Sequence, residues 1–282
     1  MRQQILQLEA AASPLEPTPA QRNDWDDQVQ DYAHDFIDNI EKNKAFHFTQ
    51  NPAAGLLDYP FGETPKDMYK VLNMLQENLH TCGINPASGG HLGYIPGGGI
   101  YPGALGDYLA AVTNQYAGIF FADPGAVRIE NQLIRWMCEL VGYPSTALGN
   151  LSSGGSIANL IAFVTARDFK KITSTKVRKS VIYLTEQVHH CVHKAIRIGG
   201  MAEAQVRNVP MDSRCRMDAV ALAQMVEKDK AAGLKPFLVV GSAGTTDTGA
   251  VDPLEKIAAV CQQHELWFHV DAAYGGFFLL AD

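Results

Sequence analysis

The sequence has 282 residues, 46% of them hydrophobic, and a formal net charge of -7 at pH 7. A chain of this length and composition can bury a large core, so we expect a soluble globular protein with one large domain or two modest ones. Its Lys and Arg residues are scattered, which argues against the basic patch of a protein that binds nucleic acid or an anionic membrane.

The cysteines and the apolar runs exclude further classes of protein. No run reaches the roughly 18 apolar residues of a membrane span, and the N-terminus carries Gln and Glu where a signal peptide would be apolar. We therefore expect a cytoplasmic protein. The five cysteines lie far apart with no CxxC pair, which argues against a zinc site and a disulfide framework: Cys82, Cys138, Cys191, Cys215 and Cys261.

The first part of the chain has helical patterns. Apolar residues recur at steps of three and four from Trp25 to Ile40, which predicts an amphipathic helix. A second helix follows "GETPKD", where we expect Thr64 to cap it and Pro65 to occupy its first position. We predict that residues 1–87 form an N-terminal helical segment whose apolar faces need a partner surface. Glycine-rich residues 88–103 then predict an ordered loop.

From residue 150 onward, β-rich runs alternate with helical ones, after helical patterns at 104–117 and 125–142. This alternation predicts an α/β domain over residues 88–282, with a mainly parallel sheet flanked by helices. Ligands of such sheets bind beyond the carboxyl ends of the strands. The expected strands are 180–184, 204–209, 236–244 and 266–273, and the expected helices are 156–170, 189–198, 218–232 and 253–264.

The stretch "LSSGGSIANL" places serines and glycines directly before a helical pattern. Backbone N–H groups at a helix start, joined by serine hydroxyls, form an anion site, and glycine lets the anion come close. The alternative is an ordinary Gly-Ser turn with a serine cap. The pattern matches neither a P-loop nor a clean dinucleotide-binding fingerprint, so a generic phosphate is the better interpretation.

Other polar residues follow the remaining strands. His189 and His193 are one helical turn apart, but no H-E-x-x-H pattern accompanies them, so surface or core histidines remain the alternative to a metal site. Thr245 and Thr246 follow the strand at 236–244, where turn formation alone could explain them. Asp252 precedes a helix start, and we expect it to be a cap.

Asp271 follows the apolar run "WFHV". A carboxylate placed there must meet a charged or strongly hydrogen-bonding partner, because desolvation is otherwise costly. A protonated ring nitrogen would be such a partner. A turn cap or an ion pair with arginine is the alternative.

Four stretches matter for their order along the chain and for their spacing: "SGGSIAN", "EQVHHCVHKA", "GTTDTGAVDP" and "HVDAAYGG". Together they resemble the pyridoxal-phosphate-dependent group II amino-acid decarboxylases of fold type I, the family of the aromatic-L-amino-acid and glutamate decarboxylases. "GYIPGGG" and "FADPGAVRIE" match the N-terminal part of that family.

The resemblance implies a role for each site residue. The cofactor would be pyridoxal 5'-phosphate (PLP), with Gly155 and Ser156 at its phosphate and Thr246 near its ring. Asp271 would pair with the ring nitrogen. His189 would stack on one face of the ring, and Ala273 would lie against the other. Asp271 and His189 are thus the catalytic candidates.

The resemblance also implies a substrate and a partner. Tyr94 and Pro96 fit a segment that lines the substrate pocket in aromatic-specific relatives. Phe120 could line the pocket of a neighbouring subunit, since the family forms homodimers, although core or interface packing is the alternative. We expect an L-amino-acid substrate, with an aromatic side chain weakly favoured.

One family feature is missing. The Schiff-base lysine would follow Asp271, yet this sequence has no lysine after Lys256. We therefore expect an N-terminal fragment of a decarboxylase, inactive alone, which lacks that lysine and the small C-terminal domain. The alternatives are another fold type I PLP enzyme, such as an aminotransferase or lyase, or a non-catalytic PLP-binding or dimerising module. A nicotinamide dinucleotide-binding protein would need a glycine fingerprint that is absent.

Overall fold

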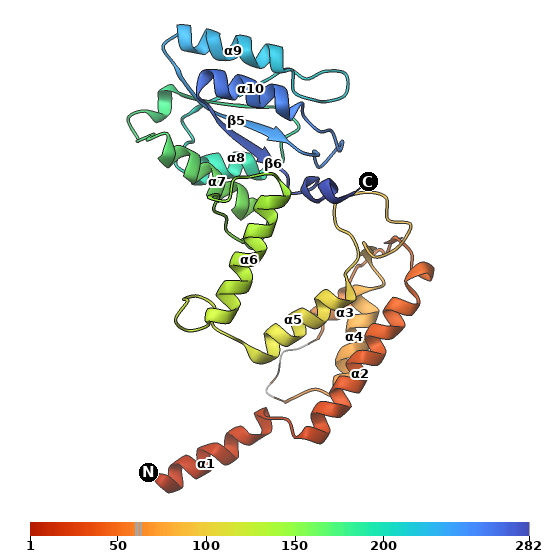
Figure 1. Ribbon diagram of the computed structural model, residues 1–282. Helices are drawn as coiled ribbons and strands as arrows, with labels where there is room; N and C mark the ends of the chain where they lie inside the picture. The colour runs from red at the N-terminus through yellow and green to blue at the C-terminus, as the bar shows by residue number, and fades with distance from the viewer. Residues whose placement is uncertain (60–61, 63, 282) are drawn as a thin grey trace. The chain divides into compact units, whose positions relative to one another are not determined.

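The protein is described by a computed structural model that covers residues 1–59, 62 and 64–281 (Figure 1). The chain divides into two compact units, Met1–Leu109 and Ala110–Asp282. The domain boundary predicted between residues 87 and 88 lies within the first unit. The division into an N-terminal helical segment and a PLP-binding domain stays a prediction. No helix of the described chain is both long enough and apolar enough to cross a membrane.

The first unit is mainly helical, as the sequence indicated. The long helix over Trp25 was expected, and it begins with a capping box in which Thr18 and Gln21 bond reciprocally. The first helix and the short antiparallel pair were not expected. The elements are α1 (Arg2–Ala12), α2 (Pro19–Asp38), β1 (Phe46–His47), α3 (Ala54–Leu57), α4 (Met68–Leu79) and β2 (Gly83–Ile84).

The predicted start of helix α4 was wrong. The helix begins at Met68, and its N-cap is Asp67, whose side chain accepts a hydrogen bond from the backbone N–H of Lys70. Thr64 and Pro65 precede the helix in an irregular stretch. A carboxylate at the N-cap satisfies a free N–H and also interacts well with the positive end of the helix dipole, which explains the later start.

Two helices come before the sheet in the sequence. Helix α5 (Tyr101–Thr113) spans the junction of the two units, and α6 (Pro124–Leu140) follows in the second. Asp123 caps α6, because its side chain accepts from the N–H of Ala126. Both helices confirm the helical patterns expected at 104–117 and 125–142, with shifted ends.

The second unit contains a parallel sheet of four strands in the order β4-β3-β5-β6, as Figure 1 shows in part. This confirms the predicted α/β class. The strands are β3 (Ser180–Leu184), β4 (Gln205–Asn208), β5 (Lys235–Ser242) and β6 (Trp267–Asp271), and the helices are α7 (Gly155–Phe169), α8 (Cys191–Ile198), α9 (Ala219–Ala231) and α10 (Leu254–His264).

Helices cover both faces of this sheet, so it has two hydrophobic cores. One core joins α7 and α8 to the first face, and the other joins α9 and α10 to the second. The register of β3 against β5 shifts after Val181, so Phe237 is an extra residue in β5. A β-bulge of this kind interrupts the alternation of side chains. As a result Phe237 and Leu238, although consecutive, both lie in the first core.

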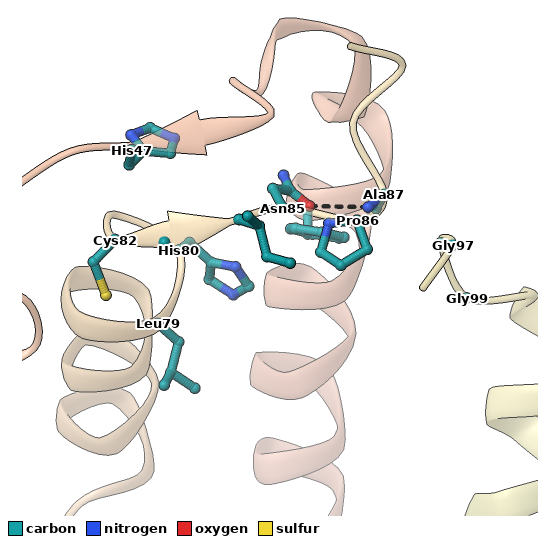
Figure 2. Close-up of a pocket in the computed structure, with 13 residues that line it drawn as sticks. His47, Leu79, His80, Cys82, Asn85, Pro86, Ala87, Gly97 and Gly99 are labelled. Carbon is teal, nitrogen blue, oxygen red and sulfur yellow. Dashed lines mark hydrogen bonds between the residues drawn. The ribbon is translucent and has the colours of Figure 1, made fainter. Parts of the chain in front are cut away.

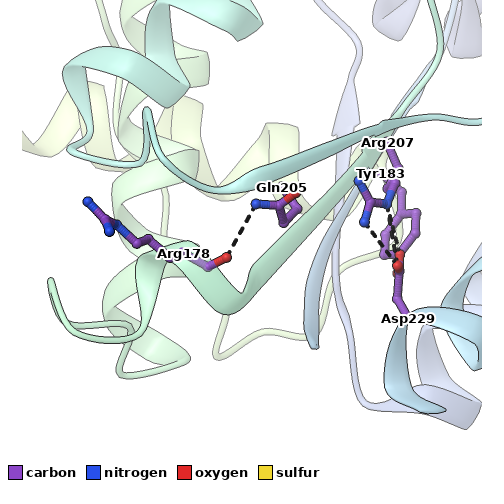
Figure 3. A network of polar contacts seen from close by, with 5 residues as sticks. All are labelled: Arg178, Tyr183, Gln205, Arg207 and Asp229. Carbon is purple, nitrogen blue, oxygen red and sulfur yellow. Dashed lines mark hydrogen bonds and ion pairs between the residues drawn. The ribbon is translucent and has the colours of Figure 1, made fainter. Parts of the chain in front are cut away.

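A buried polar network ties β3, β4 and α9 together (Figure 3). The Tyr183 hydroxyl donates to Asp229 Oδ2 at 2.8 Å, and Arg207 Nη2 lies 3.1 Å from Asp229 Oδ1. Burial raises the pKa of Tyr183, and the bond to Asp229 adds to the rise. The phenol therefore stays protonated and acts as a donor to the carboxylate.

The expectation that Asp252 caps α10 was wrong. The N-cap position belongs to Pro253. The Asp252 carboxylate is buried and accepts two backbone N–H groups, from Met217 at 2.7 Å and from Ser242 at 2.8 Å. It thereby joins the segment before α9 to the end of β5. Burial is the main reason that the pKa of Asp252 is raised.

Candidate functional site

The carboxyl end of β6 holds the acid singled out in the sequence. Asp271 is the last residue of β6 and is half-buried. Its Oδ1 accepts from the backbone N–H of Ala273 at 3.2 Å, so the turn after the strand is folded back onto the carboxylate. The backbone carbonyl of Asp271 accepts from the N–H of Ala243, at the end of the neighbouring β5. Two strand ends therefore meet at this residue.

The second carboxylate oxygen meets a buried amide. Asn159 Nδ2 lies 3.4 Å from Asp271 Oδ2 and 2.9 Å from the carbonyl oxygen of Gly155. Asn159 is in the second turn of α7, so its side chain connects the beginning of that helix to the end of β6. The predicted phosphate segment and the predicted ring-nitrogen partner are thereby brought together.

The start of α7 is open to an anion. Its N-cap is Gly154, which has φ +152° and provides no side-chain cap, and the first turn is exposed. The backbone N–H groups of an uncapped helix start can bind a phosphate. A Cβ atom added at Gly155 would lie 3.4 Å from the Cβ of Ala273, so these two predicted cofactor residues are neighbours across the site.

His269 completes the polar group below Asp271. The two residues share a face of β6, because side chains alternate along a strand. His269 Nε2 lies 2.7 Å from Asn159 Oδ1, and its ring meets the ring of Phe163 edge-on at 5.9 Å. Burial lowers the pKa of His269, and the nearby Asp271 only partly opposes this effect. The imidazole is therefore neutral at neutral pH.

His189 reaches the site through the first turn of α8. Its Nδ1 accepts from the backbone N–H of Cys191 at 3.3 Å, and the Cys191 sulfur lies 3.6 Å from Asn159 Nδ2. Burial raises the pKa of the Cys191 thiol, and the Asp271 carboxylate adds to the rise. The rings of His189 and His190 lie 4.0 Å apart, and His189 is the main cause of the lowered pKa of His190.

Thr246 lies in the loop that follows β5 and is exposed. Its neighbour Thr245 is buried and serves the loop itself, since its hydroxyl lies 2.7 Å from the Thr248 hydroxyl and accepts from the N–H of Ala250. The structure thus separates the two threonines that the sequence left equivalent. Thr246 is the one with a side chain available to a ligand.

Two predicted substrate residues, Tyr94 and Pro96, belong to the first unit and are exposed. The ring of Tyr94 stacks with that of His91 at 6.3 Å. A pocket of about 300 Å³ in the same unit is lined by Gly97 and Gly99 from this loop (Figure 2). Figure 2 also shows the rings of His47 and His80 among its lining residues.

Phe120, the third predicted substrate residue, belongs to the second unit. It is half-exposed, and the guanidinium of Arg128 lies over its ring at 5.6 Å. A pocket of about 650 Å³ between α6 and the segment around Tyr143 lies in the same unit. Neither this pocket nor the one in Figure 2 is lined by the predicted cofactor residues.

Sequence reasoning missed Asn159, His269 and Cys191. A signal existed for His269, which stands two residues before Asp271 and so shares its face of the strand. Asn159 lies four residues after Gly155, which places it one helical turn below the phosphate segment. Nothing in the sequence indicated Cys191.

Among the described residues no group of three or more His, Cys, Asp or Glu side chains could hold a metal ion.

The chain is similar to known proteins over most of its length. It is 34% identical to an aromatic-L-amino-acid decarboxylase of Bacillus atrophaeus, over 78% of this chain and 45% of that protein. It is 28% identical to a phenylacetaldehyde synthase of Petunia hybrida, over 93% of this chain and 54% of that protein. The chain thus spans about half the length of the curated relatives it matches.

A solved structure supports the same grouping at the level of the fold. It is the glutamate decarboxylase domain of a diaminobutyrate-pyruvate transaminase and L-2,4-diaminobutyrate decarboxylase from Vibrio parahaemolyticus. The TM-score is 0.84 at 24% identity, over 95% of this chain and 61% of that one. Residues 50–282 match the pyridoxal-dependent decarboxylase conserved domain. With this match over most of the sequence, the chain belongs to the pyridoxal-dependent decarboxylase family.

Proposed function

We propose that this chain forms the PLP-binding part of an enzyme that decarboxylates an L-amino acid. One observation carries the proposal: a single buried amide, Asn159, joins the open start of α7 to the Asp271 carboxylate. PLP carries a phosphate at one end and a basic ring nitrogen at the other. A helix start and a carboxylate are the groups that would receive these two ends.

The described residues fit this cofactor. Gly155 and Ala273 lie close together at the start of α7, and neither carries a side chain larger than a methyl group at the expected phosphate end. Gly155 and Ser156 would hold the phosphate, and Asp271 would hold the ring nitrogen in its protonated form. His189 and Ala273 would contact opposite faces of the ring, with Thr246 near its edge. When bound, PLP supplies an electron-accepting ring for the carbanion that decarboxylation leaves.

We further propose an aromatic amino acid as the substrate. Relatives of this chain are named for aromatic compounds, among them tyrosine decarboxylase 2 of Narcissus pseudonarcissus and tryptophan decarboxylase 2 of Oryza sativa. Tyr94, Pro96 and Phe120 remain the candidates for contact with the side chain. All three are accessible, and two of them carry aromatic rings suited to such a substrate.

A cytoplasmic homodimer is the proposed form of the protein. Helix α5 carries an exposed apolar stripe at Tyr101, Leu105 and Tyr108, spaced as one helix face. An exposed stripe of this kind is typical of an interface.

The cofactor proposal is tested by equilibrium dialysis of the chain against PLP. We expect saturable binding of one PLP per chain, weakened at least tenfold by Asp271→Ala. An exposed Asp107→Asn variant, on α5, is the matched control and should bind as the wild type does. Binding that Asp271→Ala leaves unchanged would contradict the assignment of the site.

The reaction is tested by product analysis with L-tyrosine, L-tryptophan, L-phenylalanine and L-glutamate, in a full-length protein that supplies the Schiff-base lysine expected after Asp271. Carbon dioxide and the amine in equal amounts are expected from an aromatic substrate. Keto acid without carbon dioxide would indicate an aminotransferase instead. Release of phenylacetaldehyde from L-phenylalanine would place the protein with the petunia relative.

A further inference from the structure

The hydrogen-bond direction between Asn159 and His269 follows from their surroundings. The Nδ2 group of Asn159 faces three acceptors, the Gly155 carbonyl, Asp271 Oδ2 and, at 3.6 Å, the Cys191 sulfur. Its Oδ1 therefore faces His269 Nε2 at 2.7 Å and can only accept. The reverse amide orientation would set Oδ1 against two acceptor oxygens. His269 must then carry its proton on Nε2.

With this hydrogen-bond direction, the Asp271 carboxylate accepts from two donors on different sides, and its rotation is fixed. Ala273 donates to Oδ1 from the turn after β6, and Asn159 donates to Oδ2 from α7. Because the two donors come from different elements, rotation of the carboxylate group would break at least one bond. Each oxygen still has acceptor capacity for one further donor.

We propose that Asn159 and His269 are positioning residues that hold the Asp271 carboxylate in the orientation that receives the ring nitrogen of the cofactor. This inference rests on the proposed function. His269 sets the rotation of the Asn159 amide, and Asn159 in turn sets the rotation of the carboxylate. The rings of Phe163 and His269 pack edge to face, and this contact holds the imidazole in place.

A neutral imidazole suits this role. His269 is desolvated beneath the sheet end, which disfavours its charged form. A neutral ring with its proton on Nε2 donates one hydrogen bond without placing a positive charge beside Asp271. The negative charge of Asp271 then remains available to the ring nitrogen.

Three variants separate positioning from simple packing. His269→Gln keeps an N–H donor near the place of Nε2, whereas His269→Phe keeps the bulk and loses the donor. Asn159→Ala removes the link itself. We expect Asn159→Ala, which removes a hydrogen bond to the charged Asp271 carboxylate, to weaken PLP binding about tenfold. His269→Phe, which leaves Asn159 Oδ1 without its donor, should weaken binding about fivefold, while His269→Gln stays within about twofold of the wild type.

Two spectroscopic readouts complete the test. Nitrogen-15 spectra of the cofactor-free chain should show neutral His269 protonated on Nε2 at pH 7.5. With ring-labelled PLP bound, the pyridine nitrogen should be protonated in the wild type and in His269→Gln, and less so in His269→Phe. Thermal melting checks that each variant folds, and Asn159→Ala repeats the comparison if His269→Phe does not.

The outcomes distinguish this inference from the proposed function. A wild-type chain that binds no PLP contradicts the proposed function. The spectrum of the cofactor-free chain still decides whether His269 donates its hydrogen bond to Asn159. A His269 ring protonated on Nδ1 would overturn the inference. Equal PLP binding and equal pyridine protonation in His269→Gln and His269→Phe would overturn it as well.

Discussion

Single buried polar residues hold the loops at the ends of the strands. Asp252 is the clearest case, because the residue is only 4% exposed and both carboxylate oxygens accept backbone N–H groups. The segment before α9 and the end of β5 have no shared backbone ladder at this point. The two hydrogen bonds of the Asp252 carboxylate therefore connect these segments directly.

Replacing Asp252 with Asn should destabilise the protein. The Asn amide has one acceptor oxygen for two N–H donors, and its NH2 group would face the second donor. We expect a loss of about 1–3 kcal/mol in the free energy of unfolding at pH 7. Urea unfolding measures this loss, and a variant as stable as the wild type would contradict the two-bond geometry.

The same residue predicts a pH dependence. Burial raises the pKa of Asp252 in the folded state above its unfolded value of about 3.9. Its contribution to stability is therefore fully present below about pH 3.9 and is lost as the pH rises through the folded-state pKa. The stability of the wild type relative to Asp252→Asn should fall over that window. Parallel curves for the two proteins between pH 3.5 and 7 would disprove this.

Two ion pairs of the second unit differ sharply in how far their side chains are buried. The side chains of Arg207 and Asp229 are 33% and 9% exposed, whereas those of Arg178 and Glu203 are 80% and 61% exposed (Figure 3 shows three of the four). Asp229→Asn leaves Arg207 facing an NH2 group in a buried site, so we expect a loss of about 2–4 kcal/mol. Glu203→Gln, in the exposed and solvent-screened pair, should change the free energy of unfolding far less. Chemical unfolding of both variants decides whether burial sets the difference.

At the scale of elements, the cap of α4 can be tested directly. Asp67→Ala removes the side-chain acceptor of the Lys70 N–H, and we expect a loss of about 1 kcal/mol in helix stability. Thr64→Ala is the matched control and should have no effect. Hydrogen exchange of the first-turn amides of α4 reports the change. Faster exchange in the Thr64 variant alone would contradict the Asp67 cap and support Thr64, the cap expected from the sequence.

The alternation of strands and helices after residue 150 was predictable, because each element carries its own periodicity. The strand at 180–184 was placed to the residue, and the others to within one or two residues. Caps were harder. Asp67 and Thr64 are both good caps in isolation, and only the path of the chain decides between them. The short pair of β1 and β2 carries too little pattern to be read.

The site was predictable only where its residues follow a strand or begin a helix. Asp271 and Gly155 stand at such positions. Asn159 and His269 meet across 110 positions of sequence, and no local pattern records that contact. The resemblance supplied roles for residues that touch a cofactor. It was silent about those that touch only another side chain.

At the scale of the whole molecule, the exposed stripe of α5 predicts self-association. Tyr108 is the last residue of this stripe and is half-exposed. Tyr108→Glu should weaken a homodimer at least tenfold, since a buried aromatic contact typically contributes over 1 kcal/mol. Sedimentation velocity over a range of concentrations measures this. Asp107→Asn, on the same helix, is the control and should associate as the wild type does.

The strand order has a further consequence for the sheet. Strand β6 bonds to β5 along one side, and within the described sheet its other side has no strand partner. A strand edge of this kind can pair with a further strand. The same strand ends in Asp271, so a chain added along that edge would run directly past the candidate site. A strand added there would bring its own residues beside the turn that holds the Asp271 carboxylate.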